Sequence, residues 1–137
     1  MGRILCIDFG RKRCGIAVTD PLGIAANGLP TVPTHQLMDF LKDYCSRENV
    51  DLIVMGKPTQ LNGQPSESMR YITPFLGRLH KEMPEMKVVM HDERFTSTIA
   101  HREMIAAGLP KHRRRDKGLA DKTAAVLILT GYLESRS

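Results

Sequence analysis

The chain has 137 residues, of which 42% are hydrophobic and 26% are charged. This length and balance predict one globular domain over residues 1–137, and no apolar run approaches the roughly 20 residues that a membrane span needs. Because a strand pattern starts almost at the first residue, we expect no signal peptide and a cytoplasmic location. Three cysteines without a C-x-x-C spacing argue against a disulfide framework and against a thiolate zinc site.

The net charge of +5 suits a polyanionic partner. Two basic clusters carry much of this charge. The first is the run Arg11, Lys12 and Arg13, and the second consists of Lys111, Arg113, Arg114, Arg115 and Lys117. A charge run is often only a solvated loop. Since each cluster lies close in sequence to a candidate carboxylate, we interpret both as contacts for a nucleic-acid backbone.

The first two predicted strands, residues 3–9 and 14–19, flank a turn that begins at Gly10. Their short connection predicts an antiparallel pair. The first strand is apolar on both faces apart from Asp8, which indicates a central strand covered on both sides. A carboxylate in such a strand is costly unless it is paired or binds a metal, so Asp8 is a candidate ligand.

The rest of the chain alternates between helix and strand. The patterns predict a strand at 24–29, a helix from Thr34 as N-cap to about Glu48, a strand at 51–56, a helix at 66–83, a strand at 87–91, a helix from 96–98 to 108, and a last helix from 119. Pro74 should kink the 66–83 helix or mark its true start. The order of elements predicts a mixed α/β sheet with helices on both faces.

Three acids that lie far apart in the sequence are the candidates for chemistry. Asp8 is in the first strand, Glu93 follows the last strand, and Asp121 lies in the first turn of the last helix. Mg²⁺ and Mn²⁺ prefer carboxylate oxygens and accept ligands from distant segments. Two such ions about 4 Å apart can promote phosphodiester hydrolysis. Each acid also has a simpler explanation, since Glu93 could pair with Arg94 and Asp121 could be a helix N-terminal acid.

Other chemistries lack support in the sequence. There is no Walker A motif, no G-x-G-x-x-G and no G-x-S-x-G, so nucleotide-cradling loops and acyl transfer are disfavoured. His91 has no partner at a metal-binding spacing and is interpreted as a structural or surface group. With no Trp and 5% aromatic residues, base stacking on an aromatic platform is also disfavoured.

The chain resembles the YqgF-like (RuvX) family, bacterial members of the RNase H-like nuclease group. The resemblance covers nearly the whole chain and is carried by Ile7-Asp8-Phe9-Gly10 with Arg13, by Gly15–Asp20, by Val54–Pro58 with Asn62-Gly63, by Asp92–Ser97, and by Asp121–Ala125 with Ile128-Leu129 and Tyr132-Leu133. It implies an RNase H-like fold, in which a five-stranded mixed sheet has three antiparallel strands followed by parallel ones, with helices on both faces. It also implies a site made by Asp8, Glu93 and Asp121, and a role in trimming the 5′ end of the 16S rRNA precursor.

Two features depart from the pattern of RNase H-like nucleases. Many of them carry an acid at the end of the fourth strand, whereas this chain has Gly56-Lys57-Pro58 there. Glu93 would then substitute from the fifth strand. Lys57 stands where the family resemblance implies an apolar residue, and it is a candidate phosphate contact.

The leading hypothesis is a Mg²⁺- or Mn²⁺-dependent endonuclease acting on structured precursor rRNA, as a monomer or a weak homodimer. Asp8, Glu93 and Asp121 would ligate the metal. The backbone phosphates would contact Arg11, Lys12, Arg13, Lys57, Arg94, Lys111, Arg113, Arg114, Arg115 and Lys117.

Two alternatives stay open. A Holliday-junction resolvase would act on branched DNA and needs a symmetric dimer, which nothing in the sequence specifies. A non-enzymatic RNA-binding assembly factor or transcription factor could retain the same fold. An actin-like ATPase would share the Asp8-Phe9-Gly10 strand, but 137 residues leave no room for its second domain.

Overall fold

The computed structural model describes residues 2–57, 69–92 and 117–136, with the backbone alone for 117–123 and 136. The strands are β1 (Arg3–Asp8), β2 (Arg13–Thr19), β3 (Ala26–Pro33), β4 (Val50–Lys57) and β5 (Lys87–Asp92). The helices are the short 3₁₀ helix η1 (Thr34–Gln36), α1 (Leu37–Arg47), α2 (Met69–Glu82) and α5 (Lys117–Arg136). The helix expected at 96–108 lies outside the described residues.

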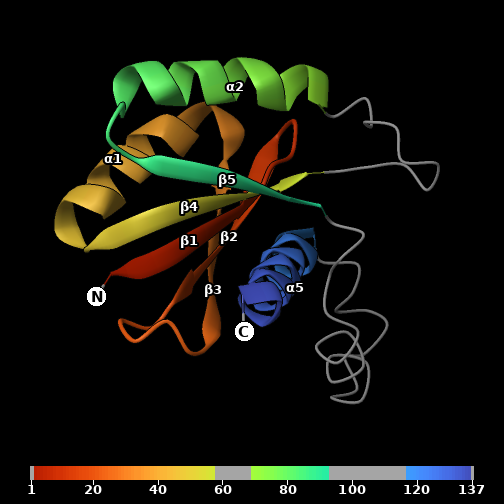
Figure 1. Ribbon diagram of the computed structural model, residues 1–137. Helices are drawn as coiled ribbons and strands as arrows, with labels where there is room; N and C mark the ends of the chain where they lie inside the picture. Colours follow the sequence, from red (N-terminus) through yellow and green to blue (C-terminus); the bar gives the residue numbers. More distant parts are fainter. Residues whose placement is uncertain (1, 58–68, 93–116, 137) are drawn as a thin grey trace.

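The five strands form one mixed sheet in the order β3-β2-β1-β4-β5 (Figure 1). β1 pairs antiparallel with β2, and β2 pairs antiparallel with β3. β4 runs parallel to β1, and β5 runs parallel to β4. This topology confirms the predicted mixed sheet with an antiparallel first half. It also places β1 in the centre, so the carboxyl ends of β1, β4 and β5 meet at one edge of the sheet.

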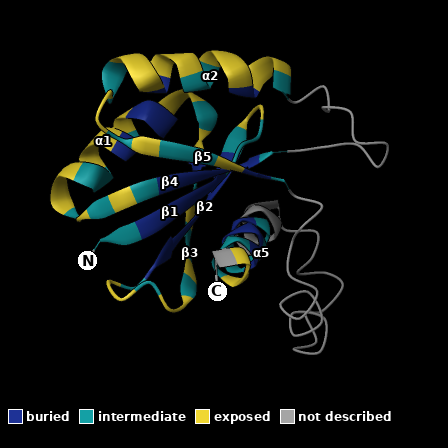
Figure 2. Cartoon of the chain, in the orientation of Figure 1, coloured by how far each residue is buried: buried dark blue, intermediate teal, exposed yellow. Residues whose placement is uncertain are grey.

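Helices cover both faces of the sheet (Figure 1). On one face, Leu5 and Ile7 of β1 belong to a buried cluster that includes Leu41 of α1 and Leu79 of α2. On the other face, the neighbouring β1 residues pack in a second cluster with residues of α5. Figure 2 shows β1 and β2 as largely buried strands between these layers. The apolar character of both β1 faces is therefore explained by two separate cores.

The cysteines of β1 and β2 lie in these two different cores. Cys6 belongs to the cluster on the α5 face, and Cys14 belongs to the cluster on the α1 and α2 face. Both are fully buried, and none of the three cysteines of the chain forms a disulfide. Such positions are typical of free cysteines, which behave in a core as small apolar side chains.

Two predicted boundaries were wrong. β3 covers Ala26–Pro33 rather than 24–29, because pairing with β2 continues from Thr19 to Arg13. Pro30 and Pro33 are tolerated since β3 is an edge strand. Thr34 is not the N-cap of the long helix, which begins only at Leu37 after the 3₁₀ turn and has no side-chain cap.

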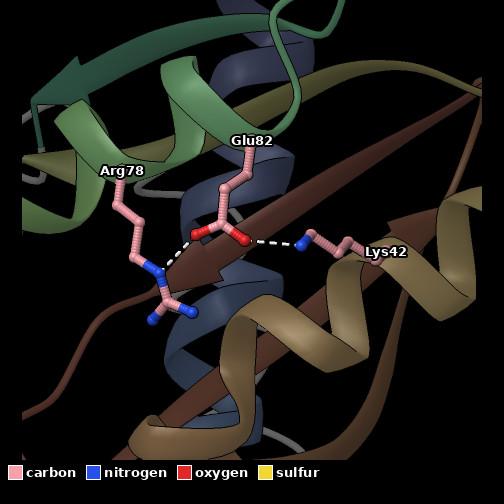
Figure 3. Close-up of polar contacts among 3 residues, drawn as sticks. All are labelled: Lys42, Arg78 and Glu82. Atoms are coloured by element: carbon pink, nitrogen blue, oxygen red, sulfur yellow. Dashed lines mark hydrogen bonds and ion pairs between the residues drawn. The ribbon is translucent and has the colours of Figure 1, made fainter.

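Helix α2 continues through Pro74, so this proline does not mark its start. Near its end, Glu82 links α2 to α1 (Figure 3). Its carboxylate accepts hydrogen bonds from Lys42 of α1, at 2.5 Å, and from Arg78 one turn earlier on α2. These hydrogen bonds, first of all the one from Lys42, lower the pKa of Glu82. Among the described helices, none is long and apolar enough to cross a membrane.

Candidate nuclease site

Asp8 is the last residue of β1, at the sheet edge where three parallel strands end. Side chains alternate along a strand, and Ile4 and Cys6 pack in the core on the α5 face. Asp8 therefore belongs to the α5 face as well. It is half-buried, whereas the four residues before it are buried. The central, apolar strand of the sheet thus ends in a carboxylate that is partly exposed to solvent.

The neighbouring strands supply Gly56 and His91 at the level of Asp8. Ile7 pairs with Met55 of β4, and Gly56 pairs with His91 of β5. The α5 face of this row therefore carries a carboxylate, a glycine without a side chain, and an imidazole. Two strand spacings put the Cα atoms of Asp8 and His91 about 10 Å apart.

His91 is buried, with 8% of its surface exposed, and its ring meets Tyr132 of α5 edge-on at a centroid distance of 5.9 Å. Its Nε2 has no hydrogen-bond partner within the described part of the chain. The structure thus makes His91 a packing contact between β5 and α5.

Lys57 and Asp92 form the next pair along β4 and β5. The alternation puts both on the α1 and α2 face, because their neighbours Met55 and Val88 belong to that core. Lys57 is therefore at the same edge as Asp8 but on the opposite face of the sheet. A nucleic-acid backbone would have to pass around this edge of the sheet to contact both Lys57 and Asp8.

The other two predicted metal ligands cannot be placed against Asp8. Glu93 follows the last residue of β5 and lies outside the described residues, and Asp121 belongs to the part of α5 described by its backbone alone. Among the side chains that the structure describes, in residues 2–57, 69–92 and 124–135, no three of His, Cys, Asp or Glu gather as a metal site would need. The three-carboxylate site therefore stays a prediction.

The turn between β1 and β2, residues 9–12, carries Arg11 and Lys12 of the first basic cluster close to Asp8, and the third member, Arg13, begins β2. Gly10 is required there, because a Cβ atom at this position would overlap the Arg13 carbonyl oxygen. The Thr34 hydroxyl donates to the Gly10 carbonyl at 2.7 Å, and the Thr34 N–H donates to the Lys12 carbonyl at 2.9 Å. Arg11 and Lys12 are exposed, and Arg13 is half-buried. The turn thus presents two solvent-accessible cations on a fixed backbone.

The remaining predicted phosphate contacts are not described at the level of side chains. Arg94, Lys111, Arg113, Arg114 and Arg115 lie outside the described residues. Lys117 is the first residue of α5, with only its backbone described.

Sequence reasoning missed two residues that shape the basic turn. Thr34 holds its backbone, as described above, and Tyr71 of α2 packs its ring against Arg11. The position of Thr34 before a helical pattern predicts a helix cap, whereas in the structure its hydroxyl bonds the turn. Tyr71 had no signal, since it is distant from the turn in sequence.

The sheet order, the helices on both faces and the carboxylate that ends the central strand define an RNase H-like fold. Solved structures of two resolvases share it. One is Thermus thermophilus RuvC in complex with a Holliday junction substrate, with a TM-score of 0.60 and 14% identity, covering 100% of this chain and 98% of that one. The other is the fowlpox virus Holliday junction resolvase, with a TM-score of 0.56 and 16% identity, covering 97% of this chain and 99% of that one.

The family follows from the sequence comparisons. The model of the RuvX family, described as Holliday junction resolvase, matches residues 2–135, and the chain belongs to this family. A relative from Phocaeicola vulgatus is 53% identical over 99% of this chain and 98% of its own. One from Porphyromonas gingivalis is 54% identical over 98% of both chains. Both relatives are provisionally named pre-16S rRNA nuclease.

Proposed function

We propose that this protein is a cytoplasmic, metal-dependent endonuclease that hydrolyses phosphodiester bonds of structured RNA, with the 16S rRNA precursor as its substrate. Its membership in the RuvX family and the names of relatives that match almost all of the chain support a nuclease. The observation that carries the proposal is the position of Asp8. This carboxylate ends the central strand and precedes a turn with two exposed cations.

Asp8, Glu93 and Asp121 would hold one or two Mg²⁺ or Mn²⁺ ions. Carboxylates are the donors that these hard cations prefer, and the half-buried Asp8 at a strand end is a suitable first ligand. A bound ion of this kind lowers the pKa of a water molecule and stabilises a leaving oxygen. The protein's own contribution would be to supply these carboxylates from three separate segments, of which the structure describes the side chain of Asp8 at the end of β1.

Arg11 and Lys12 would hold the phosphate backbone beside Asp8. They follow it by three and four residues, so their Cα atoms lie within about 14 Å of the Asp8 Cα even in a fully extended chain. Charge neutralisation of phosphates by Lys and Arg is independent of sequence, so these residues would position the substrate rather than select it.

The decisive experiment is cleavage of a labelled RNA spanning the 5′ end of the 16S rRNA by the full chain with Mg²⁺. Asp8→Asn keeps the size of the side chain but removes its charge, and we expect a loss of at least about a hundredfold. Asp39→Asn is the matched control, since Asp39 is an exposed acid on α1. Activity of Asp8→Asn equal to that of the wild type would refute the role of Asp8.

A second function is favoured by a specific observation. The family model is described as Holliday junction resolvase, and a resolvase complex shares the fold. Such an enzyme would cut a four-way DNA junction faster than precursor RNA under the same conditions, and would do so as a dimer. Salt-sensitive RNA binding without any metal-dependent cleavage would instead indicate a non-enzymatic binding protein.

A further inference from the structure

An exposed aromatic ring lies beside the basic turn. Tyr71 of α2 is 40% exposed, so part of its aromatic ring is accessible to solvent. The Arg11 guanidinium carbon lies 4.8 Å from the centroid of the Tyr71 ring. The two side chains come from elements that are distant in sequence, and the guanidinium lies over the face of the phenol ring, so that they form a stacked cation–π pair.

Contacts on both sides of the turn hold this pair in place. Phe9 and Phe75 pack with their ring centroids 5.3 Å apart. Phe9 precedes Arg11 by two residues, and Phe75 follows Tyr71 by one helical turn. The β1–β2 turn and α2 are therefore joined by two contacts, Phe9 with Phe75 and Arg11 with Tyr71. On its other side, the turn is bonded to Thr34. Little conformational freedom would be lost when a ligand binds to such a surface.

Among the described residues, each member of the pair has an exposed basic neighbour in sequence. Lys12 and Arg70 are exposed neighbours of Arg11 and Tyr71 in sequence. The described part of α2 has no acidic residue in its first turn, and its first acid is Glu82 near the end of the helix. The charges of these described residues therefore favour an anionic ligand, and the pair itself favours one that also offers a flat ring.

We propose that Arg11 and Tyr71 form a stacking platform for an unpaired base of a single-stranded nucleic acid, whose phosphates contact Lys12 and Arg70. Stacking on an aromatic ring or a guanidinium plane needs an accessible base face, which a base inside a duplex does not offer. The proposal rests on the proposed nuclease function and adds to it that a single-stranded segment of the substrate contacts the turn that follows Asp8, on the α1 and α2 side of the sheet. It departs from the expectation, drawn from the low aromatic content, that base stacking on an aromatic platform is disfavoured.

The test measures binding of the full chain to a labelled single-stranded RNA and to the same sequence in a duplex, with EDTA present so that no cleavage occurs. We expect Tyr71→Ala to weaken single-strand binding about tenfold and duplex binding less than about twofold. Tyr71→Phe keeps the ring and should bind like the wild type. His80→Ala is the control, because His80 is an exposed residue further along the same helix. Single-stranded DNA serves as a second probe, and an equal loss there indicates stacking without selection of the sugar.

Two further measurements separate stacking from charge. Arg11→Ala should reduce the slope of log K against log salt by about 0.7, whereas Tyr71→Ala should leave this slope unchanged. A single-stranded RNA carrying 5-iodouracil should crosslink to the peptide that contains Tyr71, and not to those with Tyr44 or Tyr132. If Tyr71→Ala proves unstable, Tyr71→Leu replaces it, since leucine fills space without offering an aromatic face.

Three results would overturn the platform. These are equal losses of single-strand and duplex binding, a Tyr71→Phe variant as weak as Tyr71→Ala, and crosslinks confined to other peptides. Because binding is measured without metal, the outcome does not depend on the role of Asp8. Loss of single-strand binding in Tyr71→Ala together with full cleavage by Asp8→Asn would support the platform while refuting the proposed metal site.

Discussion

Replacing Thr34 with valine tests how the basic turn is held. The Thr34 hydroxyl donates to the Gly10 carbonyl at 2.7 Å, and the Thr34 N–H donates to the Lys12 carbonyl at 2.9 Å. Valine keeps the shape of the side chain and the backbone hydrogen bond but removes the hydroxyl. The Cys14 thiol, whose sulfur lies 4.0 Å from the Gly10 carbonyl oxygen, is only a weak donor and cannot replace it.

The expected loss follows from the strength of one hydrogen bond. A neutral hydrogen bond contributes about 1 kcal/mol net, and a fully buried acceptor left without a partner costs more. Since this contact is only partly buried, water can reach the carbonyl in part. We therefore expect Thr34→Val to lower the free energy of unfolding by about 1 kcal/mol, which corresponds to about 4 °C in Tm for a chain of this size.

The test is the free energy of unfolding in urea and the Tm of three variants, Thr34→Val, Thr34→Ser and Thr73→Val. Thr34→Ser keeps the hydroxyl and should recover most of the stability. Thr73→Val makes the same chemical change at an exposed position of α2, where we expect a change of less than about 0.5 kcal/mol. The reasoning is refuted if Thr34→Val is as stable as the wild type, or if Thr34→Ser loses as much as Thr34→Val.

Three further changes have defined outcomes. Gly10→Ala brings a Cβ atom into the Arg13 carbonyl oxygen, so the turn must shift; urea unfolding should show a loss of about 2 kcal/mol, and an unchanged midpoint would contradict the steric requirement. Because the pKa of Glu82 is lowered in the folded chain, first of all by its hydrogen bond with Lys42, this carboxylate stabilises the protein at pH values above the usual pKa of a glutamate. The contribution is lost as the pH falls through the folded-state pKa. The difference in Tm between wild type and Glu82→Gln should therefore be largest near neutral pH, and a difference that grows in acid would refute this sign. Burial raises the pKa of the Cys45 thiol, so iodoacetamide should modify it with a pH profile displaced upward from that of a solvated cysteine, and a profile at the ordinary pKa would count against this effect.

Local pattern was sufficient for the central strand. From Ile4 to Ile7 the residues on both faces of the strand are apolar, which predicts that both faces are buried. The structure has one core on each face of this strand. Local pattern was insufficient for β3, whose sequence Ala26–Pro33 contains Gly28 and two prolines. Such residues have little strand propensity, and pairing with β2 sets the bounds of this edge strand instead.

Thr34 shows why a correct local signal can have a different use. A threonine before a helical pattern commonly caps the helix, because its hydroxyl can accept a hydrogen bond from the first turn. In the folded chain a carbonyl of the β1–β2 turn lies within reach, and the hydroxyl donates to it. The choice between the two uses depends on a contact with a residue 24 positions away.

The sequence by itself singled out Asp8 as a candidate metal ligand, because a carboxylate in an apolar strand is costly unless it is paired or binds a metal. Through the apolar periods it also determined the order of strands and helices in the part of the chain that the structure describes. Only the tertiary structure decided that Lys57 lies on the face opposite to Asp8 and that Arg11 meets Tyr71. These relations depend on strand register and helix packing, which are set by many weak contacts between distant segments, so no local stretch of sequence carries them.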